Sequence, residues 1–345
     1  MKQRIRQILS CTACLSLLAL SFTACSPAAK SAGTPANANS SKQVVIYTNA
    51  DDEAVEGFKN ALDGNGYKGK YVIQGFGTSD LGGKLLAEGK NLEADLITMS
   101  SYYVDSAQAK NKMFKDLTFN AKPMDKTIPA YRSPTTSQEG AILLNTDALK
   151  AANLPTPASL KDLENPVYKG QISVPDVTQS STAWLMVQAL VSAYGEDQAQ
   201  QILTGIYKNC GPHIEKSGSA PLKNVRAGSV AIGFGLRHQA VADKTKGLPI
   251  DFVDPSEGNF PLTESVAILD KGDKTNPLAM EMAKCIIEKG RPILIKTYPN
   301  PLYEGEKADA ANQSKYPKTF SQPLSVELLE KHQKISEAAK AAAQS

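Results

Sequence analysis

The sequence predicts an α/β protein of two lobes. Short β-branched runs alternate with amphipathic helical segments from residue 43 onward, which favours parallel strands joined by crossover helices. About 300 residues follow the N-terminal segments, more than one hydrophobic core usually serves. The alternation changes in the polar, Pro-containing stretches 132–149 and 250–272, where we expect two interlobe crossings.

Residues 43–136 are expected to form the first part of lobe 1. "QVVIYTN" is a β-branched run ending in a polar turn, which is typical of a buried strand. The following "DDEAVEGFKNALDGNG" has apolar residues at helical spacing, acids in its first turn and Gly at its end, so it predicts a helix. "KYVIQGF", "TSDLGGKLLAEGK" and "ADLITMS" continue as strand, helix and strand.

Residues 137–258 are expected to form lobe 2. "TQSSTAWLMVQALVSAYG" predicts a strongly apolar helix with a Ser/Thr start, and Trp184 is expected in its core. "EDQAQQILTGIYKN" and "PLKNVRAG" are further predicted helices, and "SVAIGFG" is a Gly-rich strand. Residues 259–300 return to lobe 1 with the helix "NPLAMEMAKCIIEKG", and 301–345 end in a long amphipathic helix.

The first 25 residues are expected to be a lipoprotein signal peptide. Lys2, Arg4 and Arg6 precede "ILSCTACLSLLALSF", an apolar run shorter than a spanning helix needs. "FTAC" resembles the lipobox of bacterial lipoproteins, which implies lipid on Cys25 and a membrane anchor; an ordinary secretory signal is the alternative. Residues 26–42 are rich in Ser, Ala, Pro and Asn and predict a flexible tether.

Charge and cysteine usage exclude some classes of function. The net charge is +3 with acids and bases mixed along the chain, so no basic block predicts binding to nucleic acid. Cys210 and Cys285 remain after the predicted signal; they could form a disulfide or be two separate buried thiols. Neither is at metal-site spacing, and no metal site or cofactor is predicted.

The layout resembles the type II periplasmic solute-binding proteins of ABC importers over residues 43 to about 320. The resemblance is carried by "VVIYTN", "LLAEGKNLEADLITMSS", "NPVYKGQISVPDV", "VRAGSVAIGFGLRHQAVADKTKGLPI" and "DPSEGNFPLTESVAIL". It is nearest to the branch that holds binders of ferric ion, 2-aminoethylphosphonate and sugar phosphates. It implies the two-lobed type II fold, an ABC permease and ATPase as partners, and a monomer.

Four predicted strand-to-helix turns are rich in small hydroxyl side chains. Ligands of open α/β sheets bind beyond the carboxyl ends of the strands, where helix starts offer unpaired N–H groups and a positive dipole end. Ser and Thr are also ordinary N-cap residues, so each turn alone fits a structural role. Together they predict an anion site formed by Thr48, Asn49, Ser79, Ser100, Ser101, Ser180, Ser181 and Thr182.

Arg237 and His238 follow the predicted Gly-rich strand. In the ferric-ion binders the matching positions carry two tyrosines that bind the metal, so the resemblance implies an anion in place of iron. A guanidinium matches two phosphate oxygens, and His238 could add an N–H donor. Glu257 at the second crossing, or Glu139 near the first, could pair with a ligand ammonium. Each also fits a structural or solvated role.

We therefore predict an extracytoplasmic receptor for a small organophosphorus anion, with 2-aminoethylphosphonate first and sugar phosphates second. Lobe closure would bring both sets of side chains onto the ligand. The alternative is a ferric-ion-binding protein. An enzyme is not expected, because there is no G-x-S-x-G or H-E-x-x-H motif and His332 is predicted on an exposed terminal helix. A structural envelope lipoprotein is the third class.

Overall fold

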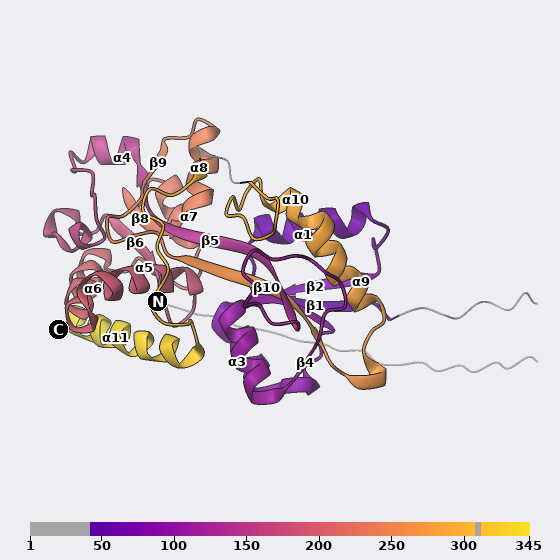
Figure 1. Ribbon diagram of the computed structural model, residues 1–345. Coiled ribbons are helices and arrows are strands. Elements are labelled where there is room, and N and C mark those ends of the chain that lie inside the picture. The colour runs from indigo at the N-terminus through magenta and orange to yellow at the C-terminus, as the bar shows by residue number, and fades with distance from the viewer. Residues whose placement is uncertain (1–41, 308–311) are drawn as a thin grey trace, which may run out of the picture. The chain divides into compact units, whose positions relative to one another are not determined.

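The computed structural model describes residues 42–307 and 312–345 (Figure 1). The predicted signal peptide, the predicted lipidation site Cys25 and residues 26–41 of the predicted tether lie outside the described residues. Within the described part of the chain, no helix is both long enough and apolar enough to span a membrane.

Lobe 1 is built on a parallel sheet whose middle strand is β1 (Val44–Thr48). It pairs with β2 (Tyr71–Gly75) on one side and β3 (Leu96–Ser100) on the other. Each strand leads into a helix: α1 (Asp52–Gly64), α2 (Thr78–Glu88) and α3 (Ser101–Asn111). The carboxyl end of β1 is therefore a switch point, since its neighbours are reached in opposite directions.

Two long antiparallel strands, β5 (Arg132–Asn145) and β10 (Pro261–Leu269), connect the lobes (Figure 1). β5 pairs with β10 through residues 132–139 and with β8 (Ile232–Leu236) of lobe 2 through residues 140–144. β4 (Phe114–Lys115) adds to β10, and β9 (Ile250–Val253) adds to β5. Lobe 1 is completed by α9 (Leu278–Cys285), the π-helix Ile286–Gly290, α10 (Arg291–Leu294) and the short 3-10 helices Gly89–Asn91 and Gly272–Lys274.

Lobe 2 repeats the parallel arrangement around β6 (Ile172–Pro175). β6 lies between β8 and β7 (Ile214–Glu215) and is parallel to both. The helices of this lobe are α4 (Thr146–Ala151), α5 (Ser181–Tyr194), α6 (Glu196–Cys210), α7 (Ala220–Arg226), α8 (Arg237–Thr245) and the 3-10 helices Lys161–Glu164 and Pro166–Tyr168. The predicted α/β fold class is confirmed.

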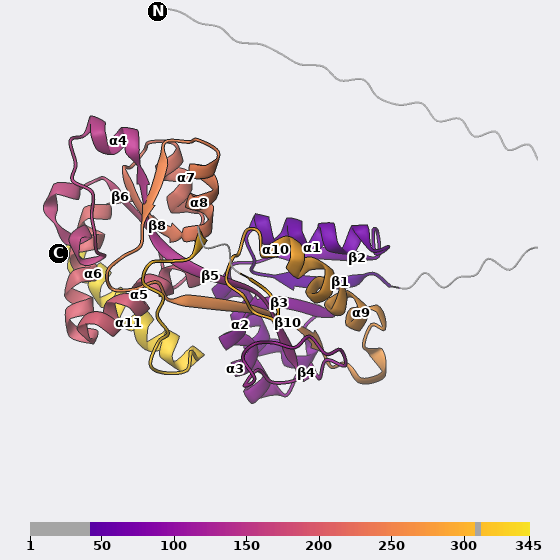
Figure 2. The same ribbon diagram turned by 45° about the horizontal axis from the view of Figure 1, so that its top comes forward.

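The terminal helix α11 (Val326–Gln344) lies beside α5 and α6 of lobe 2, as both ribbon views show (Figure 2). His332 is 1% exposed, and its Nδ1 accepts a hydrogen bond of 2.8 Å from the Trp184 indole. The prediction of an exposed His332 is wrong, because α11 packs against α5 and α6. Those helices are distant in the sequence, so the residues around His332 do not reveal this contact. Trp184 is buried in the core, as predicted.

The sequence leaves open whether Cys210 and Cys285 form a disulfide. Cys210 and Cys285 are both free and buried. Cys210 lies in the hydrophobic cluster of α5 and α6, whereas Cys285 lies in the cluster under α1 and α9. They are therefore two separate core thiols and not a disulfide.

Candidate functional site

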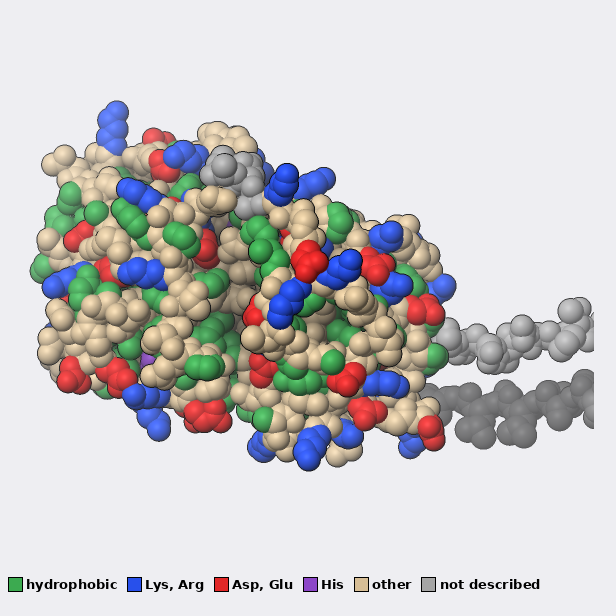
Figure 3. All heavy atoms as spheres, viewed as in Figure 1, with side chains coloured by type: hydrophobic (Ala, Val, Ile, Leu, Met, Phe, Trp, Pro, Cys, Tyr) green, Lys and Arg blue, Asp and Glu red, His purple; other side chains and the backbone are tan. Residues whose placement is uncertain are grey.

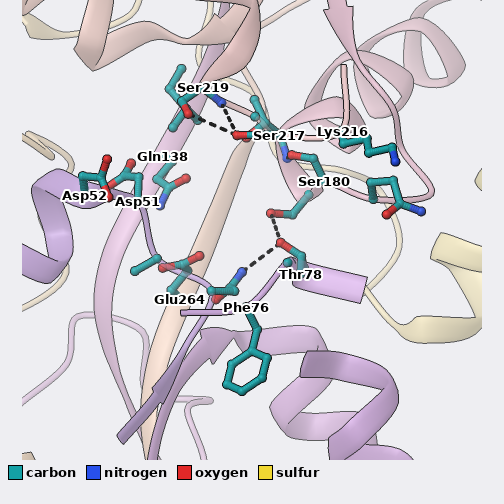
Figure 4. Close-up of a pocket in the computed structure, with 18 of the residues that line it drawn as sticks. Asp51, Asp52, Phe76, Thr78, Gln138, Ser180, Lys216, Ser217, Ser219 and Glu264 are labelled. Atoms are coloured by element: carbon teal, nitrogen blue, oxygen red, sulfur yellow. Dashed lines mark hydrogen bonds between the residues drawn. The ribbon is translucent and has the colours of Figure 1, made fainter. Parts of the chain in front are cut away.

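A cavity of about 350 Å³ lies at the carboxyl ends of β1 and β6, where the two lobes meet (Figure 4). Lobe 1 contributes residues 49–52, 76–78 and 264, and lobe 2 contributes residues 179–182, 216–219, 223 and 236, with Gln138 of β5 between them. The residues that follow the carboxyl ends of β1 and β6 line this cavity, and such ends are where open α/β sheets bind ligands.

One side of the cavity is formed by the start of α5. Ser180 is the N-cap, and its Oγ accepts from the Thr182 backbone N–H at 3.3 Å. Ser181 Oγ lies 3.4 Å from Thr78 Oγ1 of α2, so a hydroxyl of each lobe meets at this helix start. The first turn of a helix carries N–H groups without intrahelical partners and a partial positive charge, so this side favours an anion.

The loop between β7 and α7 covers the same helix start. Ser217 and Ser219 lie here, with their hydroxyl oxygens 3.1 Å apart. Gly218 allows the close approach, since a Cβ there would lie 2.1 Å from Thr182 Oγ1 and 2.9 Å from the Ser180 hydroxyl. Lys216, in the same loop, lines the cavity and makes no ion pair with another described residue.

The opposite side of the cavity is acidic. Asp51 and Asp52 lie at the start of α1, and Glu264 lies in β10; in Figure 4 these three carboxylates lie across the opening from Lys216. Glu264 is 4% exposed, and burial, reinforced by the charge of Asp51, raises its pKa to about 8. Burial also raises the pKa of Asp51. Glu264 is therefore protonated at neutral pH.

Only some of the residues predicted from the hydroxyl-rich turns line the cavity. Asn49, Ser180, Ser181 and Thr182 line it, together with Thr78. The other four support its walls and are turned to neighbouring protein groups. The Thr48 hydroxyl bonds Thr98, Ser100 accepts from Asn49 at 3.3 Å, Ser101 pairs with Ser265 at 2.8 Å, and Ser79 donates to the Thr178 carbonyl at 2.7 Å.

Arg237 lies elsewhere than the sequence suggests. Its guanidinium pairs with Asp254 at 2.7 and 3.2 Å and donates to the carbonyls of Asn312 and Gln313 at 2.7 and 3.0 Å. It also stacks over Phe252, 4.7 Å from the ring centre. The side chain is 6% exposed and does not line the cavity, so in this structure protein groups take the place of the expected phosphate.

His238 and Glu257 also lie outside the cavity. Burial lowers the pKa of His238 to about 4, so the imidazole is neutral at pH 7; it lies 3.7 Å from Asp51 and packs on the Tyr298 ring. Glu257 accepts from the backbone N–H groups of residues 160 and 161 at 2.9 and 3.0 Å and from the Tyr194 hydroxyl at 3.0 Å. Its carboxylate caps a short helix and does not face a ligand.

Sequence reasoning missed Lys216, Ser217 and Ser219. "EKSGSAP" is a Ser/Gly cluster, which is the ordinary signal of a loop, and the two-residue strand before it is too short to predict. Glu264 was missed because it lies inside a strand, where an acid on one face is usually solvated. The hydroxyl-rich composition of the loop is the one signal that could have drawn attention to it.

The described residues, 42–307 and 312–345, contain no group of three or more His, Cys, Asp and Glu side chains placed to hold a metal ion. Lys and Arg are interspersed with Asp and Glu over the face seen in Figure 3, as the mixed charge of the sequence predicts.

The model of a family described as bacterial extracellular solute-binding protein matches residues 53–289, more than half of the chain. An uncharacterised protein of Haemophilus influenzae is 25% identical over 244 residues, which cover 68% of this chain and 69% of that protein.

Solved structures share the fold. The periplasmic binding protein AfuA of Actinobacillus pleuropneumoniae, with fructose 6-phosphate bound, is 20% identical, with a TM-score of 0.69 over 88% of this chain and 97% of that one. A periplasmic thiamin-binding protein is 17% identical, with a TM-score of 0.71 over 87% and 96%. Iron-bound HitA of Pseudomonas aeruginosa is 18% identical, with a TM-score of 0.66 over 87% and 99%. The two-lobed periplasmic-binding-protein fold is thereby confirmed.

Proposed function

The chain belongs to the family of bacterial extracellular solute-binding proteins that serve ABC importers, and from this premise we propose that it captures a small organic phosphate or phosphonate. The observation that carries the proposal is the cluster of six Ser and Thr hydroxyls and two lysines around the start of α5. Hydroxyl donors, a helix N-terminus and cationic side chains together suit a dianion.

Among organophosphorus ligands, 2-aminoethylphosphonate and sugar phosphates are the two candidates. A cavity of about 350 Å³ is at the lower end of the range for small-molecule sites, so either fits by volume. AfuA, which has this fold, binds fructose 6-phosphate, and this supports a phosphorylated ligand without selecting one. HitA binds iron, so ferric ion remains the alternative that a ligand screen must include.

Closure of the lobes on the ligand follows from the way in which the cavity is shared. Thr78 comes from lobe 1, and Ser181 and Lys216 come from lobe 2, so both lobes must meet to complete the donor set. The liganded protein would then present both lobe surfaces to the permease.

We also propose that Cys25 carries lipid and holds the receptor at the membrane. Loss of membrane association in Cys25→Ser would support this proposal, and retained membrane association would contradict it.

The test is a thermal-shift screen of the purified protein, followed by calorimetric titration. The panel contains 2-aminoethylphosphonate, hexose phosphates, glycerol phosphate, inorganic phosphate, ferric citrate and thiamine. A ligand at a hundred times its dissociation constant adds about 2.7 kcal/mol to the free energy of unfolding, which is a shift of several degrees. A shift with phosphorus compounds alone supports the proposal, and a shift with ferric citrate alone overturns it.

A pair of lysine variants checks where the anion binds. Lys216→Gln is expected to weaken binding of the phosphorus ligand about tenfold, since a charge-assisted contact contributes roughly 1.5 kcal/mol. Lys169→Gln is the matched control, because Lys169 is also an exposed lysine of lobe 2 but lies outside the cavity. Equal affinities for the two variants would remove Lys216 from the site.

A further inference from the structure

Three oxygen atoms on the acidic side of the cavity have no hydrogen-bond partner among the described residues. They are Asn49 Oδ1, Asp51 Oδ2 and Glu264 Oε2, each buried and each on a residue that lines the cavity. A buried polar atom without a partner costs about 1–3 kcal/mol, so such atoms in a native protein call for an explanation. Their position at the cavity suggests that a ligand supplies the missing donors.

The bonds that these residues do make show which atoms are left over. The Asn49 amide donates to Thr78 at 3.0 Å and to Ser100 at 3.3 Å, so its carbonyl oxygen is the unused group. Asp51 Oδ1 accepts from the Ala54 N–H at 3.0 Å and from the Tyr298 hydroxyl, which leaves Oδ2. Once Glu264 has lost its proton, all three atoms need hydrogen-bond donors, and a primary ammonium offers three of them.

Charge points to the same kind of group. Asp51, Asp52 and Glu264 make no ion pair with a Lys or Arg among the described residues. His238, whose Nε2 lies 3.7 Å from Asp51, is neutral at pH 7 because burial lowers its pKa to about 4. The titratable groups that face Glu264 are Asp51 and the hydroxyls of Tyr102 and Tyr298, none of which is cationic. A neutral sugar hydroxyl would supply donors but would leave the charges of Asp51 and Asp52 unbalanced.

We propose that Asn49, Asp51 and Glu264 bind a protonated primary amine of the ligand, so that the solute is a zwitterion with its phosphorus group at α5 and its ammonium at the acidic side. This inference rests on the proposed function and narrows its ligand class. It replaces the sequence-based assignment of the amine to Glu257, whose carboxylate is occupied by backbone donors.

The binding of a cation beside Glu264 has a measurable consequence. Without a cation beside it, Glu264 is protonated at neutral pH, since its pKa is raised to about 8. A neighbouring ammonium favours the charged carboxylate and lowers that pKa. Binding of the amine-bearing ligand at pH 7 therefore releases close to one proton from Glu264, in addition to any proton that the phosphorus group itself loses when it binds as a dianion.

The experiment compares ligand pairs that differ only in the amine. The pairs are 2-aminoethylphosphonate with ethylphosphonate, and glucosamine 6-phosphate with glucose 6-phosphate. Calorimetric titrations of the purified protein at pH 7, in two non-phosphate buffers of different ionisation enthalpy, give both the affinity and the protons released. We expect at least one amine-bearing ligand to bind ten or more times more tightly than its partner, and to release about one proton more from the unmodified protein than from a variant without the Glu264 carboxyl group.

Two variants assign the effect to the acidic side. Glu264→Gln is expected to reduce the amine preference to within about threefold and to lower the number of released protons by about one. Glu139→Gln is the matched control, a half-buried acid on the paired strand β5 that does not line the cavity, and it is expected to keep both. Because the ligand pairs also test the unmodified protein, the inference stays falsifiable even if Glu264→Gln does not fold.

The outcomes separate this inference from the proposed function. If ethylphosphonate or glucose 6-phosphate binds as tightly as its amine-bearing partner, the inference is overturned and the proposed function stands. If no phosphorus compound binds, the proposed function fails and the inference fails with it. An amine preference that persists unchanged in Glu264→Gln would also overturn the assignment to this side of the cavity.

Discussion

Replacement of Arg237 distinguishes a structural arginine from an anion-binding one. The change is Arg237→Met, which removes the charge and keeps much of the side-chain volume. Arg237 and Asp254 are 6% and 8% exposed, and removing one partner of a buried pair costs about 3–5 kcal/mol. Asp254 would still accept from Asn259 at 2.9 Å and from the Lys315 N–H at 3.0 Å. We therefore expect a loss of about 3 kcal/mol, at the lower end of the range.

The assay is urea unfolding of ligand-free protein, with the ligand affinity of the same variant measured by calorimetry. Arg132→Met is the control, because Arg132 also makes a two-bond pair, at 2.6 and 2.9 Å, but its partner Asp105 has a side chain that is 38% exposed. Exposed pairs contribute up to about 1 kcal/mol. If Arg237→Met keeps its stability and loses tenfold or more in ligand affinity, Arg237 contacts the anion and the present reasoning is refuted.

Further predictions concern the loop over α5, the packing of α11 and the effect of pH. Gly218→Ala is expected to weaken ligand binding about tenfold, because the added Cβ would press on the start of α5. Gly83→Ala is the control: its Cβ would have open space around it, so binding is expected to stay unchanged and α2 to be stabilised by roughly 0.5–1 kcal/mol. Calorimetry measures the affinity of both variants, and urea unfolding measures their stability. His332→Ala is expected to cost about 2 kcal/mol in urea unfolding, since it leaves the Trp184 indole N–H unpaired in the core, and a loss below about 0.5 kcal/mol would contradict that contact. The pKa of Glu264 is raised to about 8 in the folded chain, which therefore holds this proton at pH values where the unfolded chain has lost it. The free energy of unfolding is expected to fall as the pH rises from about 6.5 to 8, and Glu264→Gln should remove this slope. Urea titrations at pH 6.5, 7.5 and 8.5 check this, and an unchanged slope in the variant would contradict the assignment.

Local periodicity was enough to predict the elements around the cavity. The run "VVIYT" is β1, the acid-rich segment after it is α1, and the Ser/Thr start before "AWLMVQ" is the N-terminus of α5. These features depend on neighbours a few residues apart, which the sequence displays directly. Ser180 is an N-cap as well as a wall of the cavity, so its structural and binding interpretations describe one residue in two roles.

The partners of charged side chains could not be predicted in the same way. Arg237 looked available for a ligand, but β9 brings Asp254 to its guanidinium. Glu257 looked exposed at a turn, but its carboxylate meets backbone N–H groups about a hundred residues earlier in the chain. Such pairings depend on which distant segments the sheet brings together, and no local pattern encodes that.

The sequence by itself determined the strand and helix alternation, the hydroxyl-rich start of α5 and the resemblance to solute receptors. Only the tertiary structure decided which charges face the cavity, because strand pairing brings Lys216 of one lobe and Glu264 of the other to a common space while it buries Arg237 against Asp254. Burial then sets the charge state of Glu264, since desolvation acts on a carboxyl group only after folding has removed its water.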